Sequence, residues 1–175
     1  SDLRKDVVAH GLTTEKHIEI RDFTLNNHKP YGEPHSKRRG FLADEKFPRE
    51  GKLVYFVGCT PSYRQKEIAK ATIKLLKHSG EDFTLLSDEW CCGSVHNRLG
   101  YEDAGKDTMD HNIKEIEKTG AETIVTSCAG CYRTFRESYQ KLKDEEGYEV
   151  KAVHITELLD KLADERRITF SAGKP

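Results

Sequence analysis

Two hydrophobic periods alternate along the chain from residue 52 onward. "KLVYFVG", beginning at Lys52, is a continuous apolar run of strand length, typical of a parallel strand buried on both faces. Similar short runs follow in "DFTLL", "ETIVTS" and "YEVKAVH". The segments between and after these runs carry apolar residues at the three- and four-residue spacing of amphipathic helices: "RQKEIAKATIKLLKHSG", "EDAGKDTMDHNIKEIEKTG", "AGCYRTFRESYQKLKDEEG" and "ITELLDKLADE". "RITF", near the end, is a candidate fifth strand.

The predicted order is therefore strand and helix in regular alternation. Strands separated by helices of this length form a parallel sheet with right-handed crossovers. We therefore predict an α/β fold with a doubly wound, mainly parallel sheet of four to five strands and helices on both faces.

Residues 1–50 follow a different pattern. "RKDVVAH" and "TEKHIEIRDFTLN" predict two short helices, and "NNHKPYGEPHSKRRG" has the proline, glycine and asparagine of an irregular connector. The run Lys37-Arg38-Arg39 is interpreted as part of a solvated linker in preference to an anion-binding patch. We predict an N-terminal helical and irregular extension over 1–50 and the α/β domain over 51–175. Both ends of the sequence look cut, which predicts a fragment of a longer chain.

Composition narrows the class of protein. The chain has 175 residues, 34% of them charged, and a formal net charge of −1, which argues against a nucleic-acid partner. No window approaches eighteen apolar residues, and the N-terminus has no secretory h-region, so we predict no direct membrane insertion and a cytoplasmic location. Because disulfides are rare in that reducing compartment, the five cysteines are better interpreted as metal ligands or redox groups.

All five cysteines fall just after predicted strands. Cys59 follows the first strand, Cys91 and Cys92 lie in the loop after the second, and Cys128 and Cys131 span the junction between the third strand and its helix. Because the carboxyl ends of parallel strands share one sheet edge, the fold would bring the thiols together where such sheets bind ligands.

The spacing favours a cluster of several metal atoms. A single zinc ion uses four ligands, so five thiolates exceed its needs, and adjacent cysteines bind one small ion awkwardly. In an iron–sulfur cluster adjacent thiolates can bind different irons. Zinc, or a thiol site without metal, remains the alternative.

The stretches "FVGCTPSYR", "DEWCCGS" and "TSCAGCYRTF" resemble the cysteine-rich CCG domain of the catalytic subunits of heterodisulfide reductases and related iron–sulfur oxidoreductases. "PYGEPHSKR" resembles the connector that precedes the first CCG domain in two-domain reductase subunits. Only one CCG motif is present, whereas those subunits carry two, and the ferredoxin-type cysteines expected upstream are absent.

The resemblance implies a function and a cofactor. One noncubane [4Fe-4S] cluster would be held by Cys59, Cys91, Cys92, Cys128 and Cys131, which would act in catalysis through it. The implied activity is reduction of a disulfide of the CoM-S-S-CoB type in one-electron steps. The implied partners are a second CCG domain, other iron–sulfur electron-transfer subunits and a thiol or disulfide substrate, and the fragment alone is expected to be inactive. The alternative activity is electron transfer in a respiratory dehydrogenase complex without disulfide chemistry, with membrane association through a partner subunit. A further alternative is a zinc-binding structural module.

His96, close to the CCG motif, is a candidate proton donor to a departing thiolate, although a surface or capping histidine explains it as well.

Overall fold

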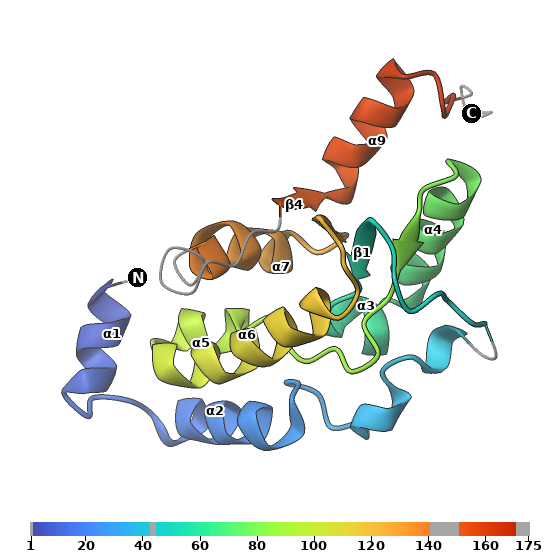
Figure 1. Cartoon of the computed structure of the whole chain (residues 1–175). Helices are drawn as coiled ribbons and strands as arrows, with labels where there is room; N and C mark the ends of the chain where they lie inside the picture. The colour runs from blue at the N-terminus through green and yellow to red at the C-terminus, as the bar shows by residue number, and fades with distance from the viewer. Residues whose placement is uncertain (1, 43–44, 141–150, 171–175) are drawn as a thin grey trace, which may run out of the picture.

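The computed structural model describes residues 2–42, 45–140 and 151–170 (Figure 1). The two helices predicted near the N-terminus are present, as α1 (Asp2–Ala9) and α2 (Glu15–Asn27). They are followed by two short 3₁₀ turns, η1 (His35–Lys37) and η2 (Gly40–Leu42).

The sheet has four parallel strands in the described residues, β1 (Leu53–Phe56), β2 (Phe83–Thr84), β3 (Thr123–Thr126) and β4 (Lys151–His154). Their order is β2-β1-β3-β4. The chain therefore leaves β1 for β2 on one side and later returns to the other side of β1 to form β3. This reversal places a topological switch point between the carboxyl ends of β1 and β3.

Helices alternate with the strands as predicted. They are α3 (Cys59–Tyr63), α4 (Lys66–His78), α5 (Ser94–Leu99), α6 (Glu102–Glu117), α7 (Ala129–Thr134) with its π-helical continuation η3 (Phe135–Tyr139), and α9 (Ile155–Asp164). The doubly wound α/β class is confirmed.

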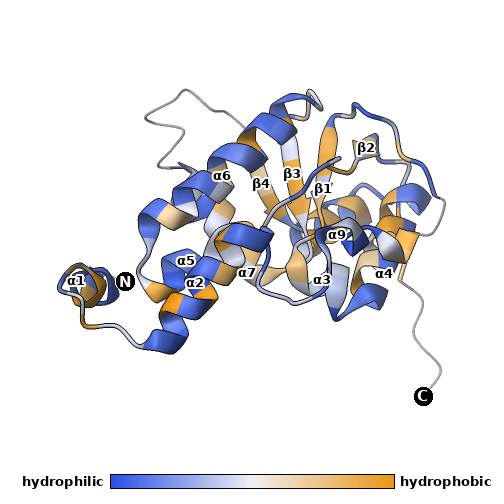
Figure 2. Cartoon of the chain, turned by 90° about the horizontal axis from the view of Figure 1, so that it is seen from below, coloured by the Kyte–Doolittle hydropathy of each residue, from blue (hydrophilic) through white to orange (hydrophobic). Residues whose placement is uncertain are grey.

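The sheet separates two hydrophobic cores because alternate residues of each strand point to opposite faces. Tyr55 of β1 packs with residues of α4 and α9 on one face. Phe56 packs with residues of α6, α7 and η3 on the other. Figure 2 shows the strands side by side as a hydrophobic layer among the helices. The second core reaches the sheet's carboxyl edge, where it includes Cys92 and Cys131.

The segment "RITF" does not add a fifth strand. Arg166 adopts a left-handed conformation (φ 57°), and the main-chain N–H groups of Arg167 and Ile168 donate to the Leu162 carbonyl at the end of α9. The chain thus turns back over the helix, and Ile168 is buried in the core with α9. Its hydrophobicity reflects this packing instead of strand pairing.

The N-terminal extension packs on the domain. Helix α2 runs beneath α5 and α6 (Figure 1). Leu42 joins the core that contains α4. The predicted boundary between residues 50 and 51 stays a prediction, but the extension contributes to the interior of the molecule.

In the parts of the chain that the structure describes, no helix is both long and apolar enough to cross a membrane.

Candidate metal centre

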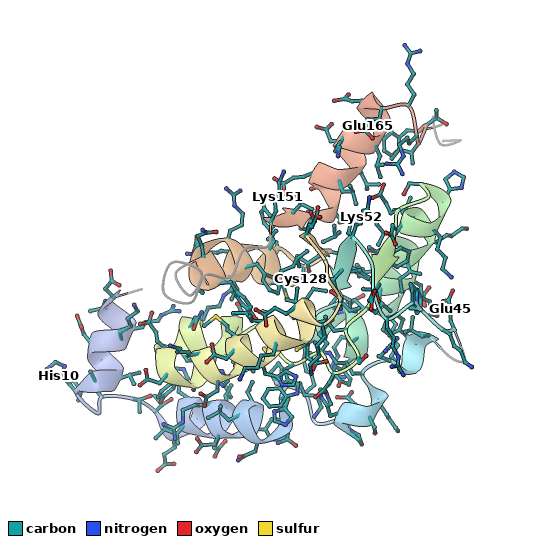
Figure 3. All side chains as sticks on the ribbon, in the orientation of Figure 1. His10, Glu45, Lys52, Cys128, Lys151 and Glu165 are labelled. Atoms are coloured by element: carbon teal, nitrogen blue, oxygen red, sulfur yellow. The ribbon has the colours of Figure 1, made fainter. Side chains whose placement is uncertain are left out.

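The fold brings the five cysteines together at the carboxyl edge of the sheet. Cys59 is the first residue of α3, Cys128 precedes α7 as its N-cap, and Cys131 lies in the first turn of α7. Cys91 and Cys92 come from the loop between β2 and α5. All five thiols are free, and all except the partly exposed Cys128 are buried. Figure 3 labels Cys128 in the middle of the molecule, beside α7.

The thiols form a line of hydrogen-bonding neighbours. Cys59 contacts Cys91, Cys91 contacts Cys92, Cys92 contacts Cys131, and Cys131 contacts Cys128. The adjacent pair occupies the middle of this line. Cys91 adjoins Cys59, and Cys92 adjoins Cys131.

Hydrogen-bond donors other than thiols reach four of the five sulfur atoms. The main-chain amide of Gly93 donates to Cys91, that of Ser94 to Cys92, and those of Gly130 and Cys131 to Cys128. The Arg38 guanidinium donates to Cys59 through Nη1, at 3.5 Å from Sγ. Such donors stabilise thiolate, the form of cysteine that binds metal.

The pKa values of the five thiols are shifted in both directions by their neighbours. The thiols of Cys131 and Cys91 lower the pKa of Cys92 well below its usual range, and the Cys131 thiol lowers that of Cys128 to about 5. Contact with Cys91, together with burial, raises the pKa of Cys59, and contacts with Cys128 and Cys92 raise that of Cys131. For Cys91, Cys59 lowers the pKa, but Cys92 and burial raise it to about 12. Metal binding would release protons from the thiols that are protonated, because cysteine binds metal as thiolate.

The donor set bears on how many metal atoms the site could hold. Within residues 2–42, 45–140 and 151–170, no three or more His, Cys, Asp or Glu side chains are grouped as ligands of one metal ion. A tetrahedral zinc site needs four ligands around one point. A line of five contiguous soft sulfur donors instead fits a group that contains several metal atoms.

The low pKa of Cys128, at the exposed end of the line, predicts how its alkylation rate depends on pH. In the reduced, metal-free protein, iodoacetamide should alkylate Cys128 first. Its rate should be half-maximal near pH 5 and fall at lower pH, because only the thiolate reacts. Peptide mapping by mass spectrometry measures the rate at each cysteine. Earlier labelling of the buried Cys59, or a Cys128 rate that rises only near pH 8.5 as for an ordinary thiol, would contradict it.

An aromatic stack borders Cys91. The Trp90 ring lies between the rings of His28 and His111, with centroids 3.5 Å and 3.7 Å away and nearly parallel planes. The Cys91 amide donates to the His28 carbonyl at 2.8 Å, and Asn112 Nδ2 donates to the Cys91 carbonyl at 2.9 Å. The chain just after α2 and helix α6 therefore both fix the Cys91 backbone.

The interpretation of Lys37-Arg38-Arg39 as a solvated linker is wrong for Arg38, which is 4% exposed. Its guanidinium forms a buried ion pair with Glu89, the residue that precedes Trp90. Sequence reasoning also missed Glu89, although an acidic residue two positions before the CCG motif was a possible signal. Glu89 accepts from the amides of Val57 and Gly58, each at 2.8 Å, and so fixes the turn that presents Cys59.

His96 lies in α5 and is buried. Its Nε2 is 3.2 Å from the Arg21 carbonyl of α2, and burial lowers its pKa, which favours the neutral ring. The contact with α2 accounts for its position in the fold, and its role as a proton donor stays a prediction.

The fold and the thiols together define a cysteine-rich α/β domain with five free cysteines gathered at its switch point. Residues 53–136 match the model of the CCG family, described as a cysteine-rich domain. This part of the chain belongs to that family, as the motifs predicted.

Curated relatives extend the match beyond these residues. One subunit of the dihydromethanophenazine:CoB–CoM heterodisulfide reductase of Methanosarcina acetivorans is 37% identical over 148 residues, 82% of this chain and 36% of the relative. An uncharacterized iron–sulfur protein of Methanococcus maripaludis is 27% identical over 162 residues, 91% of this chain and 32% of the relative. An EtfAB:quinone oxidoreductase of Syntrophomonas wolfei is 28% identical over 156 residues, 81% of this chain and 21% of the relative. The chain spans about a third or less of these relatives, and no solved structure matches it.

Proposed function

We propose that the five cysteines hold an iron–sulfur cluster, of the noncubane [4Fe-4S] type, and that the chain is the electron-carrying domain of an oxidoreductase. The observation that carries this proposal is the group of five contiguous thiols, in which Cys91 adjoins Cys59 and Cys92 adjoins Cys131. Adjacent cysteines with different thiol neighbours suit ligands of different metal atoms. When bound, the cluster would supply transfer of one electron at a time.

The charges beside the site support an anionic occupant. Two buried cations, Lys29 and Arg38, lie near Cys59, whereas Glu89 supplies one buried carboxylate. A buried excess positive charge is costly unless a negative group balances it. A cluster held by thiolates would provide that balance.

For the reaction, we propose reduction of a disulfide of the CoM-S-S-CoB type, carried out with a second CCG domain and electron-donating iron–sulfur subunits. The name of the Methanosarcina relative supports this choice. The partly exposed Cys128 gives the site an edge that a substrate sulfur could approach. His96 would remain a neutral ring near the site unless the bound group changes its surroundings.

A second candidate is electron transfer without disulfide chemistry. The burial of four of the five thiols favours it, because an electron can reach a buried group that a substrate cannot touch. The name of the quinone oxidoreductase relative points the same way.

Metal analysis tests the cofactor. Chain prepared anaerobically and reconstituted with iron and sulfide should contain about four irons and show broad visible absorption. One zinc per chain with no iron would overturn the cluster assignment.

Reaction with a disulfide distinguishes the two candidates. The chemically reduced, cluster-loaded chain is mixed with CoM-S-S-CoB and a second reduced CCG domain, so that two electrons are available for each disulfide, and thiol release is measured together with cluster oxidation. Release of thiols in step with oxidation supports disulfide chemistry. Oxidation by a quinone analogue, with no thiol release from the disulfide even when a second CCG domain is supplied, supports electron transfer alone.

A further inference from the structure

The N-terminal extension places an arginine against the first cysteine of the line. Arg38 ends η1, outside the matched CCG segment, yet its side chain reaches Cys59 at the end of β1. The guanidinium is 4% exposed and its partner Glu89 is 5% exposed. A charge this deeply buried is poorly screened by water, so it acts strongly on its neighbours.

The contacts of Arg38 fix where this charge lies. Nε donates to Glu89 Oε1 at 3.2 Å, Nη2 donates to the same carboxylate and to the Trp90 carbonyl at 3.3 Å, and Nη1 donates to Cys59 Sγ at 3.5 Å. One planar guanidinium thus connects the turn after β1 with the loop that carries Cys91 and Cys92. Its orientation leaves Nη1 directed at sulfur.

Lys29 adds a second buried charge from the same extension. Its side chain is 2% exposed, and its Nζ donates to the Asn27 carbonyl at 3.0 Å. It interacts electrostatically with Arg38 and Cys59, and with Glu33, which is itself paired with the exposed Arg64. Lys29 and Arg38 against Glu89 leave one net buried positive charge beside Cys59.

We propose that Lys29 and Arg38 set the reduction potential of the group held by the thiols, which makes the N-terminal extension a working part of the centre. The inference rests on the proposed function, because it assumes that the bound group takes up an electron. A fixed positive charge favours the more negative, reduced state, so these cations raise the potential, and Glu89 lowers it. The Arg38 N–H bond to Cys59 acts in the same direction as the positive charge.

The test measures the midpoint potential of the cluster-loaded chain by a dithionite titration followed by electron paramagnetic resonance. Arg38→Gln and Lys29→Met should each lower the potential, and Glu89→Gln should raise it. A tenfold change in the one-electron equilibrium, equivalent to 59 mV, is the expected scale for Arg38→Gln. The double variant Arg38→Gln/Glu89→Gln removes both charges and should return close to the original value. Arg64→Gln, an arginine with a 45% exposed side chain that is paired with Glu33, is the matched control and should have little effect.

Arg38→Gln and Glu89→Gln should shift the midpoint potential in opposite directions. This separates electrostatics from structural damage, because damage would not raise the potential in one variant and lower it in the other. Each single variant of the ion pair leaves a buried charge unpaired and is expected to lose stability. If these variants do not fold, Lys29→Met still gives the answer, because it changes neither member of the ion pair. Unchanged potentials in the single variants, with full iron content, would overturn this inference and leave the cluster assignment intact. Absence of iron from the unmodified chain would instead overturn the proposed function.

Discussion

Replacement of Cys92 by serine is expected to remove most of the iron from the reconstituted chain. Cys92 lies in the middle of the line of thiols, contacts both Cys91 and Cys131, and has the pKa that these contacts lower well below its usual range. Serine nearly preserves the volume, but its hydroxyl is neither a soft ligand nor ionised at neutral pH. Iron per chain should fall at least fivefold, measured by metal and sulfide analysis of anaerobically reconstituted protein.

The matched control is Cys128→Ser, at the partly exposed end of the same line. Cys128 has only one thiol neighbour, so its loss leaves the rest of the line nearly complete. This variant should keep more iron than Cys92→Ser, although its cluster should be more easily lost. Full iron content in Cys92→Ser would mean that Cys92 is not a ligand, and the noncubane assignment would then fail.

The periodicity of the sequence predicted the architecture because each strand and helix buries one continuous face. The apolar run at Lys52 became β1, and Met109, Ile113 and Ile116 are all buried on one face of α6. The same reasoning was less accurate for short segments. "DFTLL" pairs with β1 only through Phe83 and Thr84, and Ile168, predicted to lie in a strand, is instead buried against α9. Burial can be predicted from such patterns, but they do not specify what a short segment packs against.

The cysteine cluster could be predicted for a topological reason: parallel strands deliver whatever follows them to one edge. Its charged surroundings could not. Arg38 stands between Lys37 and Arg39 in a connector with proline and glycine nearby, and nothing local distinguishes it from its exposed or half-exposed neighbours. Its burial depends on Glu89, 51 residues further along the chain. A buried ion pair is a property of the tertiary structure, and the sequence carries only the two separate residues.

The glycines also show which features of the site could be predicted from the sequence and which could not. The position of Gly93 beside the cysteine pair suggests that it lets the backbone turn close to the metal group, and its φ of 88° does require glycine. A Cβ there, however, would meet α6, at the Gly105 carbonyl and Met109. Among the described glycines, Gly58 is the one whose added Cβ would come closest to a sulfur atom; it precedes Cys59, and no local pattern distinguishes it from any other glycine after a strand.

Gly58→Ala is therefore expected to damage the site without altering any cysteine. Gly58 has φ 81°, where an alanine costs about 1–2 kcal/mol, and the new Cβ would lie 3.0 Å from Cys131 Sγ. Either the sulfur of Cys131 must move, which would disturb its contacts with Cys92 and Cys128, or the turn that Glu89 holds must open, which would displace Cys59. We expect iron per chain to fall by more than half and the denaturation midpoint to fall as well.

Gly120→Ala is the matched control, because it has a similar φ of 66° but no atom within 4 Å of the added Cβ. It should lose comparable backbone stability and keep its iron. Equal iron contents in the two variants would show that the close approach of Gly58 to Cys131 is not needed to assemble the centre.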